Sequence, residues 1–323
     1  MEVRAKKALG QHFLVDQGIA QRIVSALGAD DSATGDVLEI GPGMGVLTQY
    51  LLKREDIHLK MIELDEESVN YLLTHFNDMQ GRLFLGDYLR MNIHHLFEDR
   101  YRIIGNFPYN ISSQIFFKIL DDRDRVPEVV CMIQKEVAER IAEKPGTKTY
   151  GILSVLLQAW YDIEYLFTVE PGAFAPPPKV RSAVIRLRRN DRTALMAAGL
   201  PRKGVSTPGH GQGEGPCGDK WSKATQETQG GAVVQGDKGD QTESLPGQPC
   251  CHLVDEKLFR TIVKTAFNQR RKTLRNALKP MLNPAAEGFA EFIADSIFDL
   301  RAERLGVEDF IALTEKCSRF VKV

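Results

Sequence analysis

The sequence predicts an α/β protein with a doubly wound, Rossmann-like sheet of about seven strands and a small all-helical C-terminal domain. Three observations predict this fold. Short apolar runs alternate with segments of helical periodicity through the first 190 residues, as they do in βαβ units. A glycine-rich turn follows an early apolar run, and polar side chains follow several later ones. Beyond residue 255 the apolar residues have helical spacing only.

The predicted strands and helices alternate in a regular order. A helical segment at 19–27 precedes the first strand. Helices between the strands are predicted at 46–53, 66–77, 112–120 and 135–143. Strands are predicted at 37–40, 59–63, 82–85, 102–105, 128–133, 163–169 and 183–187. In such a sheet, ligands bind at the carboxyl ends of the strands.

Composition divides the chain into three parts. Residues 1–190 hold the predicted sheet and form a cofactor-binding catalytic domain. Residues 191–254 are rich in Gly, Gln and Pro, and we expect a disordered insertion because they cannot bury enough apolar area to offset the entropy of ordering. Residues 255–323 form a small helical domain. Its helices are predicted at 258–278, 289–298 and 307–320.

Bulk properties narrow the class of protein. A chain of 323 residues, 43% of them hydrophobic, can bury a sizeable core. The N-terminal residues lack the apolar core of a signal peptide, and no apolar stretch approaches the ~20 residues that a membrane span needs. We therefore expect a soluble cytoplasmic protein without a membrane partner. The formal net charge of −1 means that nucleic-acid binding would depend on local basic clusters.

Cysteines within the insertion superficially suggest a metal site. Cys250 and Cys251 are adjacent, and they lack the C-x2-C spacing with which two thiolates share a tetrahedral ion. We therefore expect no metal, and we interpret Cys217, Cys250, Cys251 and His252 as incidental.

Polar groups at three strand ends predict a cofactor site. Gly41, Gly43 and Gly45 are spaced Gly-x-Gly-x-Gly after the first strand, where glycines permit a tight turn and close approach of a ligand. Glu63 ends the second strand, 22 residues after Gly41 (63 − 41), where its carboxylate can accept both ribose hydroxyls. Asp87 follows the third strand and is placed to meet an adenine. The three ends together indicate a nucleoside cofactor.

The tetrapeptide Asn106-Phe-Pro-Tyr109 follows the fourth strand and predicts a reaction site. The side-chain oxygen of Asn106 can accept one N–H of an exocyclic amine, and a backbone carbonyl near Pro108 can accept the other. Pro108 stiffens the turn. Tyr109 offers a flat face on which a base taken out of its helix can stack. These groups predict methyl transfer from a sulfonium cofactor to a base nitrogen, driven mainly by positioning.

Motifs along nearly the whole chain, the insertion excepted, resemble the small-subunit rRNA adenine dimethyltransferases, the KsgA group. No single motif would suffice, but they occur in the order of that family. They are Leu9-Gly-Gln-His-Phe-Leu14, Glu39–Gly45, Ile62-Glu-Leu-Asp65, Asn106–Tyr109, Gln134-Lys-Glu-Val137, Phe174-Ala-Pro-Pro-Pro-Lys-Val180 and Asn268-Gln-Arg-Arg-Lys-Thr-Leu-Arg275.

The resemblance implies a reaction and further site residues. It implies that S-adenosylmethionine donates methyl groups to N6 of two adjacent adenines near the 3′ end of 16S rRNA, in the immature 30S subunit. It implies that His12 and Leu14 border the cofactor, together with Gly41, Glu63, Asp87 and Asn106. It also implies that Phe174 packs against the target base. The chain departs from the family at position 107, where Leu is commonest, and at position 12, where Asn is frequent.

Basic residues near the start of the C-terminal domain predict RNA contacts. Arg270, Arg271, Lys272 and Arg275 lie on or beside one helical segment, and such a cluster can neutralise phosphates. The alternative interpretation is a solvated helix face, which is common for runs of charge. We expect the protein to act on 16S rRNA as a monomer.

Three other functions remain open from the sequence. An enzyme that methylates 23S rRNA and confers antibiotic resistance would share the catalytic motifs, although the basic C-terminal domain favours 16S rRNA. A non-enzymatic ribosome assembly factor would keep the fold without turnover, but Asn106, Pro108 and Tyr109 are intact. A nicotinamide oxidoreductase is disfavoured, because Val46 stands where the dinucleotide motif needs its third glycine.

Overall fold

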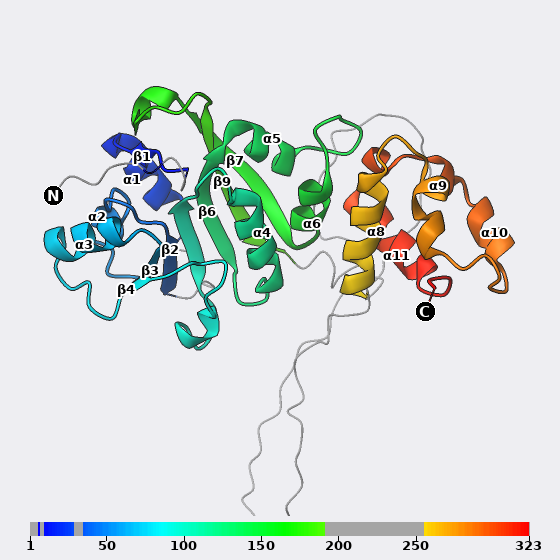
Figure 1. The fold of residues 1–323 in the computed structure, drawn as a ribbon, viewed down its shortest axis with the longest axis horizontal. Helices are drawn as coiled ribbons and strands as arrows, with labels where there is room; N and C mark the ends of the chain where they lie inside the picture. Colours follow the sequence, from blue (N-terminus) through cyan, green and yellow to red (C-terminus); the bar gives the residue numbers. More distant parts are fainter. Residues whose placement is uncertain (1–5, 7–9, 29–34, 191–254, 323) are drawn as a thin grey trace, which may run out of the picture.

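The structure, a computed structural model, describes residues 6, 10–28, 35–190 and 255–322, and the predicted insertion therefore lies outside the described residues. A mixed seven-stranded sheet forms the centre, in the order β4-β3-β2-β5-β6-β9-β7 (Figure 1). This confirms the predicted sheet. Its strands are β2 (Asp36–Ile40), β3 (His58–Glu63), β4 (Leu83–Leu85), β5 (Arg102–Asn106), β6 (Glu128–Gln134), β7 (Tyr161–Val169) and β9 (Ser182–Arg189).

Strand order places the ligand site. From β2 the chain adds β3 and β4 on one side, then crosses to add β5 and β6 on the other. All of these neighbouring pairs are parallel. The loops that leave β2 and β5 therefore diverge, and a crevice opens between them at the carboxyl ends of the strands. β9 runs antiparallel between β6 and β7, so the last third of the sheet departs from the βαβ pattern.

Helices cover both faces of the sheet (Figure 1). Successive strand residues face opposite ways, so Ile104 and Val130 pack with α1 and α2, whereas Ile103 and Val129 pack with α4 and α6. Apolar residues on both sides of the central strands explain why those strands are continuous hydrophobic runs in the sequence. The helices are α1 (Gln17–Ala26), α2 (Thr48–Leu51), α3 (Glu66–His75), α4 (Ser112–Asp121), α5 (Lys135–Ala142) and α6 (Ile152–Trp160).

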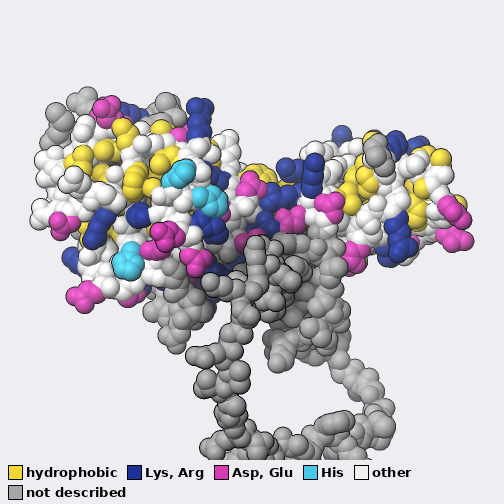
Figure 2. Space-filling model, turned by 90° about the horizontal axis from the view of Figure 1, so that it is seen from below, with side chains coloured by type: hydrophobic (Ala, Val, Ile, Leu, Met, Phe, Trp, Pro, Cys, Tyr) yellow, Lys and Arg dark blue, Asp and Glu magenta, His cyan; other side chains and the backbone are white. Residues whose placement is uncertain are grey.

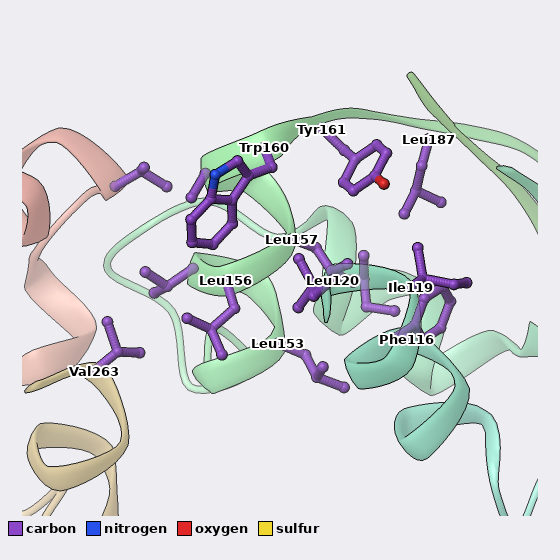
Figure 3. Close-up of a cluster of buried hydrophobic side chains, with 14 of the residues drawn as sticks. Phe116, Ile119, Leu120, Leu153, Leu156, Leu157, Trp160, Tyr161, Leu187 and Val263 are labelled. Atoms are coloured by element: carbon purple, nitrogen blue, oxygen red, sulfur yellow. The ribbon is translucent and has the colours of Figure 1, made fainter. Parts of the chain in front are cut away.

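Helix α6 was not predicted from the sequence. Seven of its nine residues are buried, so it has no polar face that would reveal a period. It lies between the sheet domain and α8 (Glu256–Asn268), where Leu153, Leu156 and Leu157 pack with Phe116 and Val263 in one cluster (Figure 3). A helix that is apolar all round is thus explained by burial on several sides.

The C-terminal helices pack directly on the sheet domain and share its core. Trp160 meets Phe259 edge-on, with ring centroids 5.6 Å apart. Arg123 pairs with Glu256 beside these rings. The predicted helix at 258–278 is interrupted after Asn268, and the one at 289–298 ends early. The helices are α8 (Glu256–Asn268), α9 (Leu274–Leu278), α10 (Phe289–Ala294) and α11 (Val307–Cys317).

A second, two-stranded sheet lies beside the crevice. It joins β1 (Phe13–Leu14) to β8 (Phe174–Ala175), antiparallel, with Leu14 opposite Phe174. The N-terminal segment is thereby brought across the edge of the ligand site. Among the described residues, no helix has the length and apolar character that crossing a bilayer would require.

Candidate active site

A cavity of about 210 Å³ opens at the carboxyl ends of β2, β3, β4 and β5. The N-terminal segment that includes β1 closes one side of it. Nine predicted site residues line this cavity, although they come from distant parts of the sequence. Those predicted for the cofactor alone are His12, Leu14, Gly41, Gly43, Glu63 and Asp87, and those predicted for the reaction alone are Pro108 and Tyr109. Asn106 was predicted for both roles.

The glycine turn is shaped for a ligand. Gly41 has φ +68°, and a Cβ built on it would meet no atom within 4 Å, so open space adjoins the backbone at this point. Gly45 has φ +79°, and a Cβ there would lie 2.6 Å from the ring of Phe76. Gly41 therefore borders the cavity, and Gly45 lets the chain pack closely against α3.

Glu63 is held at the end of β3 by backbone donors. Its side chain accepts hydrogen bonds from the N–H groups of Gly43 and Asp65, both over 2.9 Å. Burial raises the pKa of Glu63, and these hydrogen bonds oppose part of that shift. Each carboxylate oxygen has a second lone pair, so Glu63 can still accept two hydroxyl groups. The residue fits the predicted ribose-binding role.

Asp87 lies in the turn after β4 and lines the same cavity. Its Oδ1 accepts the N–H of Leu89 over 2.9 Å, which fixes the turn. Arg90 lies 3.4 Å from Oδ2. Contact between Asp87 and a cofactor adenine stays a prediction, and its position in the cavity supports it.

Asn106 ends β5 and its amide is fixed by the N-terminal segment. Its Nδ2 donates to the backbone carbonyl of His12 over 3.1 Å. Its Oδ1 accepts no hydrogen bond from the described residues, so an acceptor remains for an exocyclic N–H. The next residue is Phe107. Its N–H donates to the backbone carbonyl of Met132, and its ring packs edge-on against the ring of Phe116. The ring at position 107 is therefore part of the core beneath the cavity.

Tyr109 is oriented from two sides. Its hydroxyl group is hydrogen-bonded to Oγ of Ser182, the first residue of β9, which is fully buried. The ring of His12 stacks near its face, with centroids 5.6 Å apart and planes at 28°. The imidazole Nδ1 also lies 2.9 Å from the carbonyl oxygen of Pro176. Burial raises the pKa of Tyr109, which keeps the phenol protonated.

Phe174 is the exception among the residues predicted for the catalytic site. It is only 3% exposed, packs with Leu14 in the core and does not line the cavity. In this structure it supports the β1–β8 sheet. Its contact with a target base stays a prediction that this position does not support.

Two residues at the site were not predicted from the sequence: Glu39, which lines the cavity, and Ser182, which lies outside it and contacts Tyr109. Glu39 precedes the glycine turn and is buried in the cavity wall, and Ser182 reaches Tyr109 from β9. The Glu39–Gly45 motif can be recognised in the sequence, but the sequence does not show whether a residue inside a strand faces a ligand. Ser182 lies 73 residues from Tyr109, and only the tertiary fold brings them together.

The predicted RNA-binding cluster separates into two pairs. Arg270 donates to Glu303 and to the carbonyl of Thr147, and Arg275 donates to Asp299. By contrast, the side chains of Arg271 and Lys272 are exposed and form no hydrogen bond or ion pair with the described residues. Figure 2 shows Lys and Arg side chains interleaved with acidic ones where the sheet domain meets the helical part. Arg270 therefore contributes to the junction, and Arg275 contributes to the fold of the C-terminal domain itself.

The residues around the cavity fit S-adenosylmethionine. Gly41 leaves room beside the backbone, Glu63 can accept hydroxyl groups, and Asn106 has a spare acceptor. No Lys or Arg is found among the described residues that line the cavity, which suits a sulfonium cation.

Comparisons with known proteins agree with this geometry. A family profile described as "Ribosomal RNA adenine dimethylase" matches residues 2–198. "Ribosomal RNA small subunit methyltransferase A" of Parabacteroides distasonis is 47% identical over 312 residues, which cover 97% of this chain and 93% of that protein. The protein of the same name from Cytophaga hutchinsonii is 46% identical over 318 residues, which cover 98% of each chain.

Solved structures confirm the fold. A dimethyladenosine transferase from Plasmodium falciparum has a TM-score of 0.64 at 21% identity, with 94% of this chain and 96% of that chain covered. The 23S rRNA methyltransferase ErmE has a TM-score of 0.55 at 18% identity, with 94% and 99% covered. Since a dimethyladenosine transferase and a 23S rRNA methyltransferase share this architecture, the fold does not identify the RNA substrate.

The family match and the curated relatives confirm the predicted enzyme class, an S-adenosylmethionine-dependent rRNA adenine methyltransferase. The fold, the cavity and the similarity over nearly the full length lead to one conclusion: this chain belongs to the ribosomal RNA adenine dimethylase family.

Proposed function

We propose that the protein transfers methyl groups from S-adenosylmethionine to N6 of two adjacent adenines near the 3′ end of 16S rRNA, and that it acts as a monomer on the immature 30S subunit. The observation that carries the proposal is the fixed amide of Asn106, whose oxygen remains available at the edge of the cofactor cavity. The names of the relatives, which specify the small ribosomal subunit, support the choice of RNA.

The side chains act by positioning the amine. When bound, S-adenosylmethionine supplies an electrophilic methyl group. Asn106 Oδ1 accepts one N–H of the adenine amine, and the backbone carbonyl of the Phe107–Pro108 turn accepts the other. These two acceptors orient the nitrogen lone pair, and Tyr109 offers a stacking face for the base. Neither the Asn106 nor the Tyr109 side chain has to act as a nucleophile.

Exposed cations at the domain junction support a role for this surface in binding the RNA backbone. The N–H of Gly146 donates to the carbonyl of Glu303 over 2.6 Å, so the α5–α6 loop touches the C-terminal domain. Arg270 joins the same two segments. Exposed cations lie on the segments that meet there, and phosphate binding by them would be salt-dependent. They are Lys148, Arg271, Lys272 and Arg304.

Two alternatives are less well supported. An enzyme acting on 23S rRNA would have the same fold, but the curated relatives at 44–47% identity carry the small-subunit name. A non-enzymatic assembly factor would need no intact acceptor at Asn106. Both alternatives predict no label at adjacent 16S adenines.

The test is direct mapping of the methylated nucleotides. The full chain is incubated with labelled S-adenosylmethionine and undermethylated 30S subunits, and separately with 50S subunits. Label on two adjacent adenines near the 3′ end of 16S rRNA is expected. Label confined to 23S rRNA, or absent from both, would refute the proposal. Sedimentation of the free protein at the mass of one chain tests the monomer.

A further inference from the structure

Three acidic residues line the cofactor cavity, and no basic Lys or Arg is found among the described residues that line it. The three acids are Glu39, Glu63 and Asp87. Glu39 and Glu63 are buried, with 1% and 5% of their surface exposed. Two buried carboxyl groups without a cation in the cavity wall would repel each other if both were ionised.

Glu39 is the deeper of the two and has few partners. It lies on β2, and its side chain accepts one hydrogen bond, from the hydroxyl of Thr48 on α2 over 2.7 Å. On the neighbouring strand β3, the charge of Glu63 interacts electrostatically with Glu39. On the other side, in β5, the residue paired with Glu39 is the apolar Ile104. Glu63 differs because its carboxylate accepts hydrogen bonds from two backbone N–H groups, and these bonds favour its charged form.

Burial raises the pKa of Glu39 to about 8, with a smaller contribution from the charge of Glu63. The hydrogen bond from Thr48 opposes this shift only in part. A carboxyl group in these surroundings is neutral at pH 7 unless a cation enters the cavity. Glu39 is thus buried beside a second acid and without a Lys or Arg among the described cavity residues, unlike an acid that forms an ion pair.

We propose that Glu39 is a specificity-determining residue for the cofactor. Its carboxyl group is protonated in the ligand-free protein and loses its proton to solvent when the cationic sulfonium donor enters the cavity. The resulting carboxylate favours this donor over the thioether product, which lacks the sulfonium charge. In this step the carboxyl O–H bond of Glu39 breaks and the proton passes to buffer. The proposal rests on the proposed function, because it takes S-adenosylmethionine as the ligand.

The direction of the pH effect follows from the ionisation. A positive charge in the cavity favours the carboxylate and lowers its pKa in the complex. At pH 7 a group that titrates near 8 is about nine-tenths protonated, so donor binding should release up to about nine-tenths of a proton. Donor affinity should therefore rise with pH, by at most about tenfold per unit, and level off above pH 8. The product should release fewer protons, since it lacks the sulfonium charge.

Calorimetric titration without RNA measures how many protons are released when the ligand binds. The full chain is titrated at pH 7 with S-adenosylmethionine and with S-adenosylhomocysteine, each in two buffers of different ionisation enthalpy. Donor binding should release close to one proton and product binding clearly less. Glu39→Gln keeps the shape of the side chain and should abolish the release, together with the donor preference that depends on pH. Glu66→Gln, an exposed acid on α3, should behave like the wild type.

The outcomes separate the two proposals. No proton release in the wild type, equal release with both ligands, or unchanged release in Glu39→Gln would overturn the role of Glu39. If that variant does not fold, the pH series on the wild type decides, and a donor affinity that is constant from pH 6 to pH 9 overturns it. Failure of the wild type to bind either ligand would instead count against the proposed function.

Discussion

The side-chain amide of Asn106 donates to the backbone carbonyl of His12, 94 residues earlier in the chain. The acceptor belongs to the main chain, so the identity of residue 12 does not determine it. This explains how His can occupy a position where Asn is frequent in the family that the sequence resembles. The imidazole has separate contacts, with the ring of Tyr109 and the carbonyl of Pro176. The N-terminal segment thus forms a wall of the reaction site.

Replacing Asn106 with Ala should reduce methyl transfer by about 100-fold or more, because the oriented acceptor for the amine is lost. S-adenosylmethionine affinity should change far less. Single-turnover methylation of 30S subunits and calorimetric cofactor binding measure the two effects. Asn70→Ala, an exposed substitution on α3, is the matched control. Normal turnover in Asn106→Ala would remove this residue from the mechanism.

The hydrogen bond between Tyr109 and Ser182 should show strong coupling in a double-mutant cycle. Ser182→Ala leaves the half-buried phenol of Tyr109 without its partner, which should destabilise the protein by about 1–2 kcal/mol. Tyr109→Phe removes the other hydroxyl group. The double variant should be no less stable than Ser182→Ala. Chemical denaturation measures stability; additive losses would show that the two hydroxyl groups act independently.

Glu39 should make the stability of the ligand-free protein depend on pH. Its pKa is raised from 4.5 in the unfolded chain to about 8 in the folded protein, so between these values the folded state holds a proton that the unfolded state lacks. Stability is therefore greatest below about pH 4.5 with respect to this group and falls as pH rises through 8, by on the order of a few kcal/mol. Glu39→Gln should remove this decline. Denaturation of both proteins at pH 6 and pH 8.5 provides the comparison, and parallel curves would contradict it.

Arg271 and Lys272 should affect RNA binding without affecting stability. Changing both to Ala should weaken binding to 30S subunits and reduce the slope of log affinity against log salt by about 1–2, if each contacts a phosphate. Arg270→Ala should instead lower stability, because it removes contacts to Glu303 and Thr147. Binding at several salt concentrations and thermal denaturation separate the effects. An unchanged salt slope in the double variant would exclude the phosphate contacts.

Local sequence patterns predicted the sheet because its central strands are buried on both faces. All seven strands were predicted at or close to their observed positions, since each is an apolar run bounded by polar turns. Helix α6 was missed, because Ile152–Trp160 is buried nearly all round and shows no amphipathic period. The antiparallel direction of β9 left no local signal, because hydrophobic runs do not encode strand direction.

The sequence by itself determined the chemistry of this protein: the glycine turn, Glu63 and the Asn106–Tyr109 tetrapeptide each follow a strand, and parallel strands end at one edge of a sheet. Tertiary structure alone decided how these groups are held. It brings the His12 carbonyl to Asn106 and Ser182 to Tyr109. It also buries Phe174 outside the cavity and engages Arg270 in hydrogen bonds at the domain junction. Such contacts join residues far apart in the chain, and their geometry depends on packing that no local pattern encodes.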